Sequence, residues 1–203
     1  MAISLKKGQK VSLEKKAAGL GEILVNLNWN TRTVQGGFLS KLFGGNAKPQ
    51  SIDLDLGCLY ELKDGRKGVI QALGKAFGSL RNYPYISLDG DDRTGAVETG
   101  ENLRIDGNRV AEFKRILVFT YIYEGVANWQ QADATVTIKY PGAEDIIVKM
   151  DEFNSSKKMC ALAIFMNQND KTFSVEKLIT FYDKHRELDT AYNWGLNWVP
   201  ARK

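Results

Sequence analysis

The sequence predicts a mostly β protein, a β-sandwich with one or two short helices. Short apolar or alternating segments recur along the 203 residues, and turn residues separate them. The strongest segment, 115–123, is almost continuously apolar and aromatic, which is typical of a strand buried on both faces. Residues 134–140 alternate apolar and polar side chains and end at Pro141-Gly142, as a half-buried strand does.

The other elements follow from the same patterns. In 22–29 the spacing of Ile23, Val25 and Leu27 places these side chains toward a core. Residues 63–66 are typical of a hairpin turn, and 107–114 predicts a short helix. Residues 174–189 suit either a helix or a strand, with 183–189 solvated in both cases. The expected strands cover residues 11–13, 22–29, 53–61, 68–74, 102–106, 115–123, 134–140, 145–150 and 159–167.

No segment resembles an interdomain linker, so residues 1–203 are predicted to form a single domain with a glycine-rich insertion at about 31–50. Long loops of this kind are usually functional or disordered. The insertion carries apolar side chains that could dock on the core, on a partner protein or on a membrane surface, or could simply lie against the domain. These side chains are Phe38, Leu39, Leu42 and Phe43.

Composition narrows the class of protein. Hydrophobic residues make up 43% and charged residues 26%, as in ordinary globular domains. No apolar run approaches the roughly 18 residues of a membrane span, and the N-terminus lacks an apolar signal core. We therefore expect a cytoplasmic protein. The formal charge is only +4, and the N-terminal lysines lack interleaved aromatic residues, so nucleic acid is not an expected partner.

The cysteines and the histidine give little support to catalysis or zinc binding. Cys58 and Cys160 both lie in apolar surroundings and are expected to be buried free thiols. The alternative function is enzymatic detoxification of an oxyanion, with Cys58 or Cys160 as the reducing thiol. Such an enzyme would need an exposed thiolate of low pKa. His185, the one histidine, lies among charges and is expected to be solvated.

An acidic, glycine-containing segment at 88–102 carries most of the functional information. Its five carboxylates stand against one arginine, and like charges at this density repel unless a cation lies among them. Three glycines allow tight turns through which oxygens from several positions can converge, as Ca²⁺ requires. The carboxylates are Asp89, Asp91, Asp92, Glu98 and Glu101.

A second pair of carboxylates indicates the same ligand. Alternation along 51–60 places Asp53 and Asp55 on one face of a strand and Leu54 and Leu56 on the other. Aspartate is a poor strand former, and two adjacent carboxylates on one face repel each other. A cation shared by the two carboxylates would remove this repulsion. The competing interpretation is a solvated edge strand whose charges block aggregation.

The segment is not an EF-hand. If Asp89 takes the first position, Thr94 stands at the sixth, where glycine is needed, and Gly100 at the twelfth, where a bidentate glutamate is needed.

Several short motifs, taken in order, resemble the TerD family of tellurium-resistance and stress-response proteins. They are the opening segment 3–13, Leu27-Asn28-Trp29, Asp53-Leu54-Asp55 and Gly90-Asp91-Asp92-Arg93-Thr94-Gly95. The resemblance implies a β-sandwich, Ca²⁺ binding and a cytoplasmic stress role in bacteria without catalysis.

The resemblance also implies that the Asp53/Asp55 strand and the segment 90–101 approach each other at the metal. By motif position, the implied ligands are Asp53, Asp55, Asp91, Asp92 and Glu101. Local chemistry adds Asp89 and Glu98 as candidates. The family's segment after Thr94-Gly95 is usually denser in charge than here, which predicts that one of two calcium positions is weak or lost.

Overall fold

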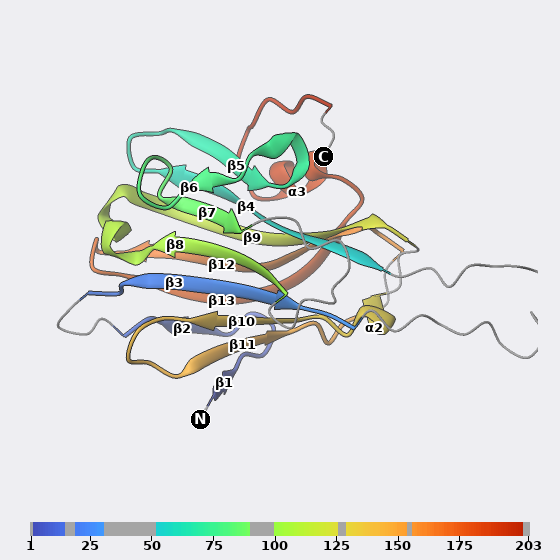
Figure 1. The fold of residues 1–203 in the computed structure, drawn as a ribbon, viewed down its shortest axis with the longest axis horizontal. Coiled ribbons are helices and arrows are strands. Elements are labelled where there is room, and N and C mark those ends of the chain that lie inside the picture. Colours follow the sequence, from blue (N-terminus) through green and yellow to red (C-terminus); the bar gives the residue numbers. More distant parts are fainter. Residues whose placement is uncertain are drawn as a thin grey trace, which may run out of the picture.

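Two β-sheets packed face to face form the protein in the computed structural model (Figure 1), which describes residues 2–14, 19–30, 52–89, 100–125, 129–153 and 156–200. The seven-stranded sheet has the order β1 (Ala2–Ser4), β11 (Asp145–Lys149), β10 (Thr135–Lys139), β3 (Glu22–Asn28), β8 (Glu101–Asp106), β7 (Ile86–Asp89), β6 (Gly78–Ser79). The six-stranded sheet has the order β2 (Lys10–Ser12), β13 (Thr172–Tyr182), β12 (Met159–Gln168), β9 (Phe113–Glu124), β4 (Asp53–Leu62), β5 (Lys67–Gln71). The predicted β-sandwich is confirmed.

Short helical segments join or flank these strands. They are η1 (Leu73–Lys75), η2 (Gly107–Glu112), α2 (Trp129–Ala132) and α3 (His185–Ala191). The helix expected at 107–114 is therefore a 3₁₀-helix that ends at Glu112, and Phe113 already starts β9. None of the described helices is both long and apolar enough to cross a membrane.

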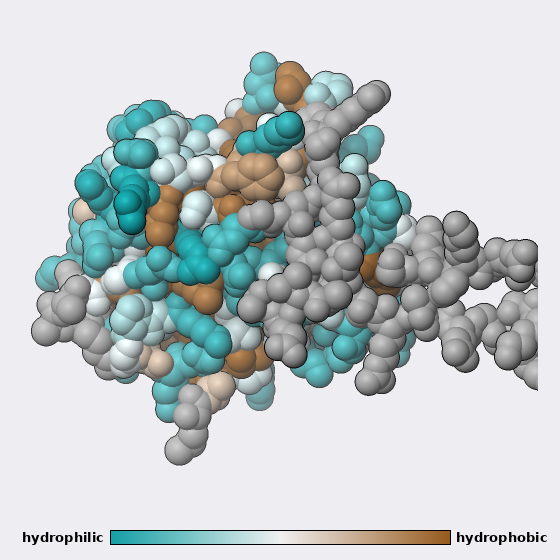
Figure 2. All heavy atoms as spheres, viewed as in Figure 1, coloured by the Kyte–Doolittle hydropathy of each residue, from teal (hydrophilic) through white to brown (hydrophobic). Residues whose placement is uncertain are grey.

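The core between the sheets forms as the alternation predicts. Ile23, Val25 and Leu27 of β3 are fully buried, and Leu54 and Leu56 of β4 face them from the other sheet. On the opposite side, the outer face of the seven-stranded sheet is mostly hydrophilic where it is described (Figure 2). Polar and apolar residues therefore separate as in other sandwiches with one solvated face.

The outer face of the six-stranded sheet is covered as well. Leu117 and Phe119 of β9 pack there with Leu188 of α3 and with Trp194, in a second apolar cluster. This layer explains why β9 is buried on both faces, as its continuous apolar sequence predicts. In Figure 1, α3 and the C-terminal segment lie behind the β5 end of this sheet.

One carboxylate holds the C-terminal segment in place. Asp189 accepts hydrogen bonds from the backbone N–H groups of Gly195 (2.8 Å) and Leu196 (2.9 Å) and from the indole of Trp198 (3.0 Å). The expectation that 183–189 is solvated is therefore wrong, because Leu188 and Asp189 are buried. The ambiguity at 174–189 resolves into both elements, since β13 runs to Tyr182 and α3 begins at His185.

Candidate functional site

The edge of β4 is open at its first residues. β5 pairs with β4 only as far as Gly57, opposite Gln71, and the chain then turns into η1. The backbone N–H of Leu56 therefore has no partner from β5 and instead donates to the Glu101 carboxylate at 2.5 Å. Glu101 begins β8 in the other sheet, so this hydrogen bond joins the two sheets where β4 extends past β5.

Three carboxylates are buried in the first residues of β4 and β8. Asp53 is 7% exposed, Asp55 0% and Glu101 1%. The interpretation of β4 as a solvated edge strand is wrong, because both of its aspartates lie inside the protein. Burial of several carboxylates in one region costs free energy, which nearby positive charge or protonation must offset.

Tyr121 reports the negative field of this region. It lies directly opposite Asp55 in the pairing of β4 with β9, so the two side chains share a face of the sheet. Burial raises the pKa of the Tyr121 phenol, and the negative charges of Asp55 and Glu101 raise it further. Sequence reasoning missed Tyr121, because only the register of two strands distant in sequence places it here.

Asp89 lies on the other face of its sheet. Glu101 points inward with Leu103, whereas Asp89 is exposed and accepts hydrogen bonds from the Arg104 guanidinium at 2.8 and 3.0 Å. Arg104 also pairs with Glu22. These bonds to Asp89 and Glu22 raise the pKa of Arg104. Asp89 thus has a protein cation as its partner and is separated from Asp55 by the sheet.

The other candidates lie outside the described residues. These are Asp91, Asp92 and Glu98, together with the insertion residues Phe38, Leu39, Leu42 and Phe43. In the sequence, segment 90–99 lies between β7 and β8, and Asp89 pairs with Asn102, so the described residues that flank the segment lie beside Glu101. Among the residues that the structure describes, no three acidic, histidine or cysteine side chains form a metal-binding group by themselves.

Oxygen ligands fit calcium at this position. Asp53, Asp55 and Glu101 offer hard carboxylate oxygens from two elements, and no described side chain of the group is a thiol or imidazole. Further oxygens would have to come from segment 90–99, whose sequence holds Asp91, Asp92 and Glu98.

Gly100 fixes how the acidic segment enters β8. Its φ is +60°, and a Cβ built on it would lie 2.1 Å from the carbonyl oxygen of Leu27. Only glycine fits, because any side chain would force the two backbones apart just before Glu101.

Gly100→Ala should therefore lower the free energy of unfolding by about 2 kcal/mol or more, from left-handed strain plus the clash. Gly65→Ala is the matched control: its φ is +88° but nothing lies within 4 Å, so only the strain, about 1 kcal/mol, is expected. Urea unfolding of both variants measures the difference. Equal losses would show that the contact with Leu27 does not restrict Gly100.

The two thiols do not meet the requirement of the alternative function. Cys58 and Cys160 are free and fully buried, and burial raises the pKa of each. They are confirmed as buried free thiols.

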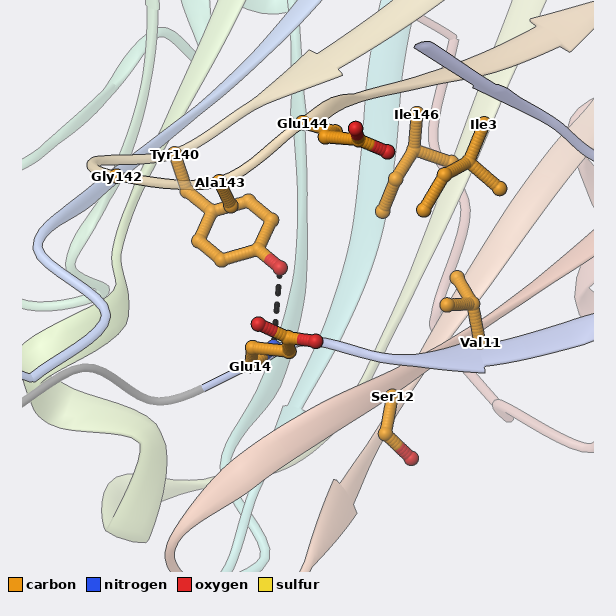
Figure 3. Close-up of a pocket in the computed structure, with 9 residues that line it drawn as sticks. All are labelled: Ile3, Val11, Ser12, Glu14, Tyr140, Gly142, Ala143, Glu144 and Ile146. Atoms are coloured by element: carbon orange, nitrogen blue, oxygen red, sulfur yellow. Dashed lines mark hydrogen bonds between the residues drawn. The ribbon is translucent and has the colours of Figure 1, made fainter. Parts of the chain in front are cut away.

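A separate pocket of about 240 Å³ lies near β1, β2 and the turn between β10 and β11 (Figure 3). In it the Tyr140 hydroxyl accepts a hydrogen bond from the backbone N–H of Glu14 at 3.0 Å. The predicted site residues that the structure describes, Asp53, Asp55, Asp89 and Glu101, do not line this pocket.

Comparison with known proteins decides the family. The TerD domain profile matches residues 1–140, most of the chain. The chain belongs to the TerD family. Its motifs therefore predicted the family correctly. β11, β12 and β13 follow residue 140 and complete the two sheets described above.

Several relatives carry resistance or stress names. The tellurium resistance protein TerA of an Alcaligenes species is 40% identical over 193 residues, which is 95% of this chain and 56% of TerA. The stress response protein SCP2 of Bacillus subtilis is 39% identical over 107 residues, 53% of this chain and 47% of SCP2. This TerD-family chain thus spans about half the length of these relatives.

A solved structure confirms the fold. A homologue of the telluride resistance protein TerD from Streptomyces coelicolor superposes with a TM-score of 0.56 at 17% identity, covering 84% of this chain and 95% of that one. A protein of unknown function, SAV2460, superposes with a TM-score of 0.60 at 14% identity over the same shares.

Proposed function

We propose that this TerD-family chain is a calcium-binding stress-response protein of the tellurium-resistance type that acts in the cytoplasm as a non-catalytic interaction module. The burial of Asp55 and Glu101 beside the ends of the acidic segment is the observation that carries the proposal. Calcium would neutralise these carboxylates and tie segment 90–99 to β4. Asp53, Asp55 and Glu101 would hold it from the sandwich, with Asp91, Asp92 and Glu98 as the candidates from the segment.

Calorimetric titration of chelator-treated protein with Ca²⁺ and Mg²⁺ tests the binding. We expect saturable calcium binding with a preference over Mg²⁺, because Mg²⁺ demands a stricter octahedral geometry and dehydrates reluctantly. Asp55→Asn should abolish measurable calcium binding, because it removes a buried carboxylate ligand. Asp89→Asn is the control and should leave it nearly unchanged, because Arg104 already pairs with Asp89. Loss of binding in Asp89→Asn but not in Asp55→Asn would refute this assignment.

The interaction role rests on the apolar insertion. We propose that calcium presents a surface that includes Phe38, Leu39, Leu42 and Phe43 to a partner protein or a membrane. Co-sedimentation with vesicles of mixed neutral and anionic lipids, in calcium and in chelator, tests the membrane form of the proposal. The proposal is supported if the protein binds vesicles only in calcium and if the double variant Phe38→Ser, Phe43→Ser no longer binds them. Binding that ignores both calcium and the substitutions would count against it.

A further inference from the structure

A second pocket, of about 290 Å³, lies on the outer side of the six-stranded sheet, where the end of β5, η1, α3 and the C-terminal segment meet. Its apolar wall comes from Leu73, Trp198, Val199 and Pro200. Val199 is 71% exposed, so this apolar surface continues to the outside of the described molecule. A concave apolar site with a few polar groups is the usual form of a small-molecule site, and this volume suits a small ligand.

Two buried polar atoms in the residues that line the pocket lack hydrogen-bond partners. They are Oε1 of Gln71 and Nε2 of His185. Gln71 is only 5% exposed, so its amide oxygen is cut off from water without a protein donor to replace it. An unsatisfied buried polar group costs about 1–3 kcal/mol, and two of them in one pocket indicate a missing partner.

The His185 side chain lies among aromatic rings and is uncharged near pH 7. Its ring lies 5.5 Å from that of Phe119, 5.1 Å from Tyr121 and 5.0 Å from Trp198, measured between centroids. Burial lowers the pKa of His185 to about 4, so the imidazole is neutral near pH 7 and offers one donor and one acceptor. The expectation that His185 is solvated is thus wrong. Aromatic residues distant in sequence surround it, which its charged local sequence did not reveal.

Both charged side chains among the described residues that line the pocket are basic, namely Lys184 and Arg186. The nearby Asp189 carboxylate is already occupied by the Trp198 indole and two backbone N–H groups. One N–H of the Arg186 guanidinium donates to the carbonyl of Trp198 at 3.0 Å, which leaves its other N–H groups for a ligand. An anionic group at the rim would therefore meet complementary charge.

We propose that this pocket binds a small aromatic carboxylate that also carries a hydroxyl or amide group. The ring lies against Trp198 and Leu73, the polar group bonds with Gln71 and His185, and the carboxylate faces Lys184 and Arg186. Each part of the ligand corresponds to one feature of the site: the apolar wall, the two unsatisfied buried atoms and the two basic side chains.

Three related compounds separate these features. 4-Hydroxyphenylacetate has all three, phenylacetate lacks the hydroxyl, and 4-hydroxyphenylacetamide lacks the charge. Titrations followed by tryptophan fluorescence and by ¹H–¹⁵N NMR, in calcium and separately in chelator, should give the lowest Kd for 4-hydroxyphenylacetate. We expect a Kd about ten times higher for each of the other two compounds. The NMR shifts should centre on the Gln71 side-chain amide and the Trp198 indole.

Two variants test the assignment within the protein. In Gln71→Leu, 4-hydroxyphenylacetate should bind no more tightly than phenylacetate. In Arg186→Gln, it should bind no more tightly than 4-hydroxyphenylacetamide. Arg81→Gln, an exposed arginine outside the lining residues, is the control and should change neither. Circular dichroism and the melting temperature check that each variant folds. No saturable binding of the acid up to about 10 mM in either condition, or equal affinity for all three compounds, would overturn the proposal. Because binding is read without calcium as well, its failure is distinguishable from failure of the calcium site.

Discussion

Asp55→Asn should stabilise the calcium-free protein and abolish its stabilisation by calcium. Asp55 is 0% exposed, with the charges of Asp55 and Glu101 both acting on the same tyrosine. Removing one buried negative charge relieves repulsion and desolvation, so in chelator we expect a gain of about 1–2 kcal/mol in the free energy of unfolding. In calcium at about 100 times Kd, the wild type should gain about 2.7 kcal/mol that the variant cannot. The variant should therefore be more stable than the wild type in chelator and less stable than the wild type in calcium.

Urea unfolding of both proteins in chelator and in calcium measures this. Asp89→Asn serves as the control, because it removes a carboxylate from the exposed face of the seven-stranded sheet, where Arg104 pairs with it. It should cost no more than about 1 kcal/mol and should do so equally in both conditions. Destabilisation by Asp55→Asn of the same size with and without calcium would mean that the carboxylate serves the fold alone.

His185 should make the protein less stable in mild acid. Burial lowers its pKa to about 4, whereas the unfolded chain titrates near the ordinary 6.5. Between these values the unfolded state binds more protons, so the free energy of unfolding falls as the pH drops from about 6.5 to about 4. The loss from this group is at most roughly 3 kcal/mol. Above pH 6.5 the contribution of His185 is complete and constant.

Carboxylates also titrate in mild acid. The difference in the free energy of unfolding between wild type and His185→Gln therefore isolates the contribution of the histidine. Unfolding experiments at pH 7, 5.5 and 4.5 should show that the difference narrows as the pH falls, because glutamine takes no proton. Tyr121 and Trp198 face the ring, and burial raises the pKa of Tyr121 far above this window. A difference that is constant across the three pH values would contradict a depressed pKa.

Local patterns predicted the parts of the fold that depend on neighbouring residues. The alternation in 22–29 and 51–60 predicted the buried faces that carry Val25 and Leu56, and the apolar run at 115–123 predicted burial on both faces. Short strands such as β6 and β7 were not predicted, because they hold too few residues to show a period.

The burial of the site could not be predicted in the same way. Asp53 and Asp55 are as polar in sequence as any solvated pair, and tertiary packing removes them from water. Likewise, the charged sequence 183–189 conceals Leu188 and His185, which pack against aromatic side chains of another strand. Sequence indicated which residues could bind calcium, and tertiary packing decided which of the described ones are buried together.

A crystal structure of the protein grown with calcium tests the central claim most directly. The account predicts a calcium ion bound by oxygens of Asp55 and Glu101 and of segment 90–99, at the 2.3–2.6 Å typical of calcium. Contradiction would be a map from calcium-saturated crystals in which these buried carboxylates are bridged only by protein groups and no ion lies between β4 and β8.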